Sequence, residues 1–146
     1  MRPFHVFAPL IAALLASAAS NAAPRQRSEN EKGAIVVLKT IHTTQQQYYS
    51  QFGRYANSLR QLGRRDRSGK STLEAAGLLD PELAWGGKNG YHFALESRGT
   101  AAYATSAAPS VFGTTASRTY CSDQTGVVHE HQGPESATTQ DPEVRR

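Results

Sequence analysis

The hydrophobic and polar positions of this chain follow a helical period first and a strand period later. Between residues 29 and 52, apolar or long side chains recur at alternating spacings of four and three, which places them on one stripe of a helix. We predict that Ser28 caps this helix, that Glu29 and Glu31 lie in its first turn, and that Gly53 ends it. The predicted buried stripe consists of Ala34, Leu38, Ile41, Gln45, Tyr48 and Phe52.

The helical period breaks between residues 54 and 70, where the chain is polar and basic. This stretch predicts a connecting loop with at most a short helical turn. A short amphipathic helix is expected at 73–79, opened by Ser71 or Thr72. Asp80-Pro81 should end it, because the residue before a proline is disfavoured in the helical region.

Trp85-Gly86-Gly87 and Asn89-Gly90 are typical of turns. After them the period falls to two, which is typical of half-buried strands. Tyr91, Phe93 and Leu95 share one face of the first strand. The predicted fold class is α+β, with one long N-terminal helix packed on a three- to four-stranded antiparallel sheet. The strands are expected at 91–96, 101–107, 118–122 and 125–131.

The first residues are typical of an export signal. Arg2 precedes an Ala/Leu-rich run at 4–19, and small residues follow, with a plausible cleavage after Ala22. A membrane anchor is the alternative, but a span needs about 20 apolar residues. This run is shorter and contains His5 and Pro9. We therefore predict a periplasmic or secreted protein whose mature chain has no stable membrane span.

The predicted division of the chain is a signal peptide at 1–22, a globular domain at 23–132 and a disordered tail at 133–146. The tail is inferred from its two prolines and its lack of apolar periodicity. A length of 146 residues, 38% of them hydrophobic, suits one small domain and excludes a large two-domain enzyme.

Catalytic and redox chemistry have little support in the sequence. No nucleophile motif, paired-carboxylate arrangement or phosphate-cradling glycine loop surrounds the histidines and serines, so we predict no catalytic residue and no cofactor. Cys121 is the single cysteine, which excludes an internal disulfide and Cys-pair metal sites. We expect it to be a small core or surface residue, with a disulfide between two chains as the alternative.

Charge is distributed unevenly along the chain. Residues 54–70 carry six cations against one carboxylate, Asp66, and Tyr55 lies nearby for stacking. They are candidate contacts for nucleic-acid phosphates or a protein partner, with a solvated surface loop as the simpler interpretation. The cations are Arg54, Arg60, Arg64, Arg65, Arg67 and Lys70.

An acidic segment balances this basic loop. Residues 119–144 hold five carboxylates and no Lys or Arg. The two segments are expected either to serve solubility alone or to pair within one molecule or between two, although exposed pairs contribute at most about 1 kcal/mol each.

Several short runs in this order resemble type IV pilins and type II secretion pseudopilins. The earlier runs are similar to the exposed helix half and first loop of that family: Glu29-Asn30-Glu31-Lys32-Gly33-Ala34, Leu38-Lys39-Thr40-Ile41-His42-Thr43, Tyr48-Tyr49, Gly53-Arg54-Tyr55-Ala56 and Leu59. The later segments are similar at Leu79-Asp80-Pro81, Lys88-Asn89-Gly90-Tyr91-His92-Phe93, 103–109, Arg118-Thr119-Tyr120 and Asp123-Gln124-Thr125-Gly126-Val127.

The resemblance implies a long helix on a small antiparallel sheet and a non-enzymatic role in protein–protein interaction, with pilus or secretion-system components as partners. It also implies an alternative, a DNA-binding pilin-like protein that uses the basic loop 54–70, because some minor pilins are implicated in DNA uptake.

The chain departs from the family at its N-terminus, where family members carry a long apolar helix that anchors subunits and stacks in the filament. Phe4 follows Pro3, Ala8 stands where the family has Glu, and Pro24 with a charged stretch separates the apolar run from Glu29. We therefore predict a soluble, exported relative of the globular domain rather than an ordinary pilus subunit.

Two weak patterns in the sequence are alternatives to the prediction of no metal site. His129 and His131 share one face of the predicted strand, where a third ligand could complete a zinc or copper site. Major pseudopilins hold calcium in a C-terminal acidic loop, and Asp123, Glu135 and Asp141 invite that comparison. The family's ligand pattern is not reproduced here, so we predict a polar edge strand.

Overall fold

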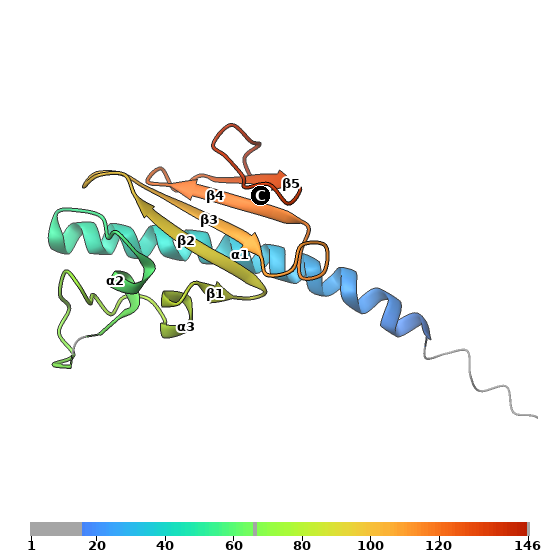
Figure 1. Cartoon of the computed structure of the whole chain (residues 1–146), viewed down its shortest axis with the longest axis horizontal. Coiled ribbons are helices and arrows are strands. Elements are labelled where there is room, and N and C mark those ends of the chain that lie inside the picture. The colour runs from blue at the N-terminus through green and yellow to red at the C-terminus, as the bar shows by residue number, and fades with distance from the viewer. Residues whose placement is uncertain (1–15, 66, 146) are drawn as a thin grey trace, which may run out of the picture.

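The computed structural model describes residues 16–65 and 67–145, and the side chains from residue 21 onward. One long helix lies across a five-stranded antiparallel sheet, whose strands follow one another in sequence order (Figure 1). The elements are α1 (Ala16–Phe52), α2 (Leu59–Gly63), α3 (Pro81–Ala84), β1 (Gly87–Lys88), β2 (Tyr91–Ser97), β3 (Tyr103–Pro109), β4 (Arg118–Asp123) and β5 (Val128–Gln132).

The predicted stripe of α1 is the face that packs against the sheet. Five of its six residues, from Ala34 to Tyr48, are buried, and Phe52 packs partly buried at the edge of the core. The sheet presents alternate residues to this stripe, as the period of two predicts. They include Tyr91, Phe93, Tyr103, Ala107, Tyr120 and Val128. The α+β fold with a long helix on an antiparallel sheet is thus confirmed.

Tyrosines dominate this interface, and their hydroxyl groups find partners inside it. Tyr48 donates to the Leu73 carbonyl at 2.6 Å, and Tyr91 donates to the Arg118 carbonyl at 2.8 Å. The Tyr103 hydroxyl lies 2.7 Å from His42 Nδ1. Each buried ring therefore contributes apolar area without leaving its hydroxyl unsatisfied. Burial raises the pKa of Tyr120 to about 12.

The helix begins earlier than predicted. Within the described residues α1 starts at Ala16, runs through Pro24, and has no acidic residue in its first turn, so the expected cap at Ser28 is wrong. Glu31 instead accepts hydrogen bonds from the backbone N–H and the hydroxyl of Ser117, both at 3.0 Å. Its other oxygen lies 3.3 Å from Arg118 Nη1. An acidic residue that resembled part of a helix start therefore ties α1 to the beginning of β4.

The sheet has five strands, one more than the expected maximum, because residues 87 and 88 pair with β2. Asn89 and Gly90 connect these strands with φ values of 52° and 74°, which is the geometry of the predicted turn. β3 begins later than expected, at Tyr103, and includes Pro109. β5 begins at Val128, three residues later than expected.

The short helix expected at 73–79 is wrong. That segment forms turns and isolated bridges. The Asp80-Pro81 pair, which was expected to end a helix, instead begins α3. Asp80 caps α3 by accepting from the Leu83 N–H at 2.9 Å, and Pro81 occupies the first helical turn, where its missing N–H costs nothing. The helical turn allowed within 54–70 is present as α2.

The predicted disordered tail is also corrected by the structure, which places residues 133–145 against β4 and β5. Thr119 Oγ1 donates to the Glu135 carbonyl at 2.6 Å, and Ala137 is buried. The backbone N–H of Glu130 donates to the Pro142 carbonyl, and that of Val144 donates to the Val128 carbonyl. A segment that is attached by backbone hydrogen bonds needs no apolar period in its sequence. These hydrogen bonds also cover part of the edge of the sheet at β5.

The predicted signal peptide lies mostly outside the described residues. Within 16–65 and 67–145, no helix combines the length and apolar character needed to cross a membrane.

Candidate functional site

The structure brings three of the six predicted contact residues together. Arg60, Arg64 and Arg65 line a groove of about 840 Å³, hereafter the arginine groove, which lies between α2, the segment 77–80 and α3. The other three are elsewhere: Arg54 follows the end of α1, and Arg67 and Lys70 are exposed in the loop that leads away from α2. The candidate site is therefore smaller than the sequence suggests.

Trp85 supplies the aromatic side chain of the groove. The residue is 75% exposed, and Arg60 Cζ lies 4.5 Å from the ring centroid, in a cation–π contact. Tyr55, which the sequence offered for stacking, is instead buried beside Tyr103, with ring centroids 4.9 Å apart. The sequence placed Trp85 in a turn and gave no signal of its neighbour, because the contact joins residues from two separate helices.

Two glycines shape the groove. A Cβ at Gly63 would collide with the Ala84 side chain, so glycine lets α2 and α3 approach closely. Gly77 has a φ of 67°, and a Cβ there would lie 2.9 Å from Arg65 Cγ. The Arg65 side chain therefore rests on a glycine, which helps to hold it beside the groove.

The charge of the groove is net positive. Asp80 also lines it, but this carboxylate pairs with Lys88. The Lys88 hydrogen bond is the main reason why the pKa of Asp80 lies below its usual value. Among the described residues, no carboxylate forms an ion pair with Arg60, Arg64 or Arg65. These three guanidinium groups are thus available to an anionic ligand.

The acidic segment lies away from the groove and has partners of its own. Figure 1 shows the C-terminal segment on the opposite side of α1 from α2 and α3. Glu130 lies 3.8 Å from Arg118, Glu135 lies 3.4 Å from His131, and Asp123 accepts hydrogen bonds from Thr125. The sequence-based idea that the acidic and basic segments pair within one molecule is therefore not supported.

The two histidines of β5 face the C-terminal segment. His131 Nδ1 lies 3.0 Å from Asp141 Oδ1, and His129 Nδ1 lies 2.8 Å from the Asp141 backbone carbonyl. In the part of the chain that the structure describes, no three His, Cys, Asp or Glu side chains are grouped to hold a metal ion. The contacts of His129 and His131 with Asp141 therefore join the C-terminal segment to the sheet.

We expect these contacts to be strongest between pH 3.8 and 6.5, the ordinary pKa values of the two groups. The His131 hydrogen bond lowers the pKa of Asp141 to about 2, so its contribution is present above pH 3.8 and is lost as the pH falls through about 2. The Asp141 hydrogen bond raises the pKa of His131 above 6.5, so its contribution is complete below 6.5 and is lost as the pH rises through the raised pKa.

Amide hydrogen exchange of residues 136–144, corrected for intrinsic rates, measures this effect. Exchange should be slowest near about pH 5 and faster near about pH 9, and His131→Gln should remove the difference. Equal protection of these amides at both pH values in the unmodified protein would contradict the assignment.

Cys121 lies on the outer face of β4 and is buried. Burial, followed by the nearby Asp141 and Asp123, raises the pKa of its thiol. A buried thiol with a raised pKa is a poor nucleophile, so the structure favours the core interpretation over a disulfide between chains.

Comparisons with protein-family models, with curated proteins and with solved structures found no match to this chain.

Proposed function

We propose that this chain is an exported, non-enzymatic, pilin-like protein that acts by binding another protein, with a type II secretion or type IV pilus system as its setting. The short sequence runs that resemble pilins and pseudopilins, and that occur in the same order along the chain, support this proposal. The α+β arrangement, with a long N-terminal helix on an antiparallel sheet, is the arrangement that the resemblance implies.

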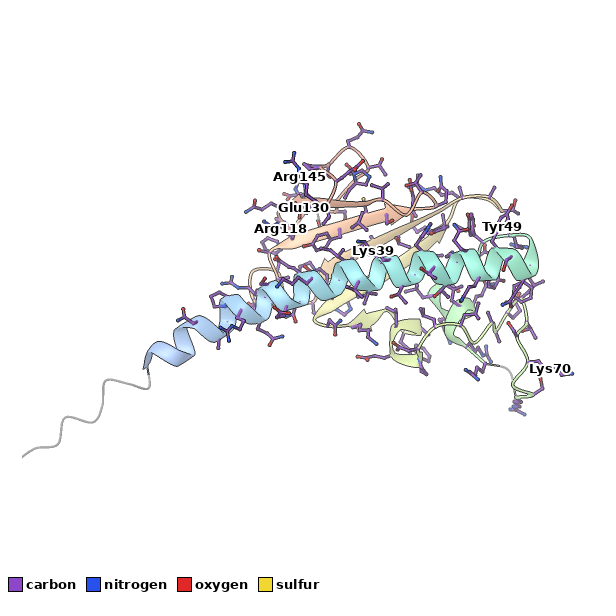
Figure 2. All side chains as sticks on the ribbon, turned by 180° about the vertical axis from the view of Figure 1, so that it is seen from behind. Lys39, Tyr49, Lys70, Arg118, Glu130 and Arg145 are labelled. Carbon is purple, nitrogen blue, oxygen red and sulfur yellow. The ribbon has the colours of Figure 1, made fainter. Side chains whose placement is uncertain are left out.

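The observation that carries the proposal is the one-sided burial of α1. The sheet covers the stripe that contains Ile41, whereas Val36 on the opposite side is 62% exposed. Figure 2 shows α1 in front of the sheet with its outer side uncovered. The outer side, hereafter the outer face of α1, is formed by Glu29, Lys32, Val36, Lys39, Thr40, Thr43, Gln47 and Ser50, all exposed.

The N-terminal part of α1 extends beyond the sheet (Figure 1). Residues 21–26 are exposed, and the first hydrogen bond from the helix to the strand connections is that of Arg27 Nη1 to the Gly113 carbonyl, at 3.0 Å. Cleavage after Ala22, as the sequence predicts, would leave the outer face of α1 intact. A partner can therefore reach this face in either form of the chain.

The composition of the outer face favours an adaptor over a self-assembling subunit. Seven of its eight residues are polar, so self-association would bury little of the apolar area that drives polymerisation at roughly 25 cal/mol per Å². Glu29 and Lys32 already pair with each other at 3.1 Å. A partner with complementary polar groups fits this face better than a second copy of it does.

Photo-crosslinking in the native cell tests this proposal. A benzophenone amino acid at Val36 or Thr43 should give adducts of defined mass, because both positions lie on the outer face of α1. His92 provides the control, since it is exposed on β2 on the side of the sheet that faces away from α1. Adducts at His92 with none at Val36 or Thr43 would overturn the assignment of this face.

A further inference from the structure

The backbone of Trp85 is held at the end of α3, while most of the residue is exposed. Trp85 caps α3, and its backbone N–H donates to the Glu82 carbonyl at 3.1 Å. The guanidinium of Arg60 lies on the ring, yet 75% of the residue remains exposed. A ring exposed to this extent can stack with a planar ligand.

Two further cations stand beside this ring. Arg64 and Arg65 line the same groove, and neither forms an ion pair with a carboxylate among the described residues. Asp80, the nearest acid on the groove wall, is neutralised by Lys88. The arginine groove therefore combines an exposed aromatic face with guanidinium groups that are free to contact phosphates.

The size and the lining of the groove limit what it can recognise. A volume of about 840 Å³ lies within the range of small-ligand sites, so it admits one or two nucleotides rather than a whole duplex. The lining of the groove includes the apolar side chains of Leu78, Leu79 and Ala84. It offers stacking and burial instead of the hydrogen bonds that read a base edge, which is typical of sites that tolerate any sequence.

We propose that the arginine groove binds single-stranded nucleic acid, with one base stacked on Trp85 and neighbouring phosphates held by Arg64 and Arg65. This inference goes beyond the protein-binding role of α1 and narrows the nucleic-acid alternative raised by residues 54–70. A duplex is disfavoured as the ligand because its bases are already stacked inside the helix. An acidic protein segment would use the same cations but would not need the indole face.

The fluorescence of Trp85 reports directly on this site, because it is the only tryptophan in the chain. Oligo(dT) of about 12 nucleotides at low salt should quench its emission to a saturating level, since a stacked base contacts the ring. A duplex of the same length and poly-glutamate should quench much less. Equal quenching by poly-glutamate, or stronger quenching by the duplex, would overturn the proposal, as would no quenching at all.

Fluorescence anisotropy of labelled oligo(dT) separates the contribution of base stacking to binding from the contribution of charge. Trp85→Leu should weaken binding at least about fivefold, because each stacked base contributes 1–3 kcal/mol. Arg64→Gln with Arg65→Gln should weaken it about tenfold or more and reduce the salt slope by about 1.4, since each phosphate contact to a single strand contributes about 0.7.

A matched control removes the same charge elsewhere. Arg98→Gln with Arg145→Gln deletes two exposed cations that lie outside the groove and outside the outer face of α1, and it should leave the salt slope nearly unchanged. If both double variants weaken binding equally, the effect is net charge and the groove assignment fails. Crosslinking at the outer face of α1 is unaffected by either outcome, so the two proposals are tested separately.

Discussion

Replacement of Gln45 by leucine is expected to lower the free energy of unfolding by about 2–5 kcal/mol. Gln45 is fully buried, and its side chain forms hydrogen bonds with both backbone polar groups of Ala56, an arrangement hereafter called the Gln45 clamp. Its Nε2 donates to the Ala56 carbonyl at 3.0 Å, and its Oε1 accepts from the Ala56 N–H at 2.8 Å. Leucine keeps the volume but leaves two buried backbone groups unsatisfied, each costing about 1–3 kcal/mol.

Urea unfolding followed by circular dichroism measures this loss, with Gln47→Leu as the control. Gln47 is exposed two residues further along α1, so the same replacement there should change stability by less than about 0.5 kcal/mol. Gln45→Glu adds a second check. Its buried carboxylate should destabilise near neutral pH, and its cost relative to the unmodified protein should shrink as the pH falls and the acid is protonated. A cost below about 0.5 kcal/mol for Gln45→Leu would show that the clamp is not formed.

The clamp also connects the fold to the candidate site. Gly53, with a φ of 68°, ends α1, and Gln45 then fixes the returning chain at Ala56, shortly before α2 begins at Leu59. α2 carries Arg60 into the groove beside Trp85. A buried amide in the core therefore helps to set the position of an exposed arginine, which links the stability of the helix end to the geometry of the groove.

The regular spacing of apolar residues predicted the helices and strands that bury one face against the core. The stripe of α1 and the alternation of β2 were both identified, because a helix or strand that packs on one side must repeat its apolar positions. The same stripe placed Gln45 inside the fold. It did not reveal the hydrogen-bonding partner of Gln45, because the backbone of Ala56 has no signature in the sequence.

Two of the errors share a physical cause, since each involves contacts between residues distant in sequence or held by backbone hydrogen bonds. Glu31 was assigned to a helix start, but it binds Ser117 and Arg118, more than 80 residues away. The C-terminal segment lacks an apolar period because backbone groups and Asp141 attach it to β5. Asp80-Pro81 was interpreted as a helix end, although the same pair is equally suited to begin one.

The candidate site was predicted in part. The excess of cations in residues 54–70 pointed to the right region, and Arg60, Arg64 and Arg65 do gather there. Composition alone could not separate them from Arg54, Arg67 and Lys70, nor add Trp85, because the groove is formed by the packing of α2 against α3. A tryptophan within turn residues was the one available signal in the sequence, and it did not indicate which residue lies beside the ring.

The account depends most on the claim that the sheet covers one face of α1 and leaves the other open, because both the fold and the partner surface follow from it. Ile41 is fully buried on the covered face, whereas Val36 is 62% exposed on the outer face. Ile41→Ala should cost about 2–5 kcal/mol through lost apolar burial and the cavity left behind. Val36→Ala removes a branched side chain of similar size and should change stability by less than about 0.5 kcal/mol.

The most direct measurement is the pair of unfolding free energies for these two variants, determined under the same conditions from urea titrations of the same full chain. We predict a difference of at least about 2 kcal/mol between them, with Ile41→Ala the less stable. Equal losses at both positions would mean that α1 is covered on both sides, and negligible losses at both would mean that it stands free of the sheet. Either result would contradict the account.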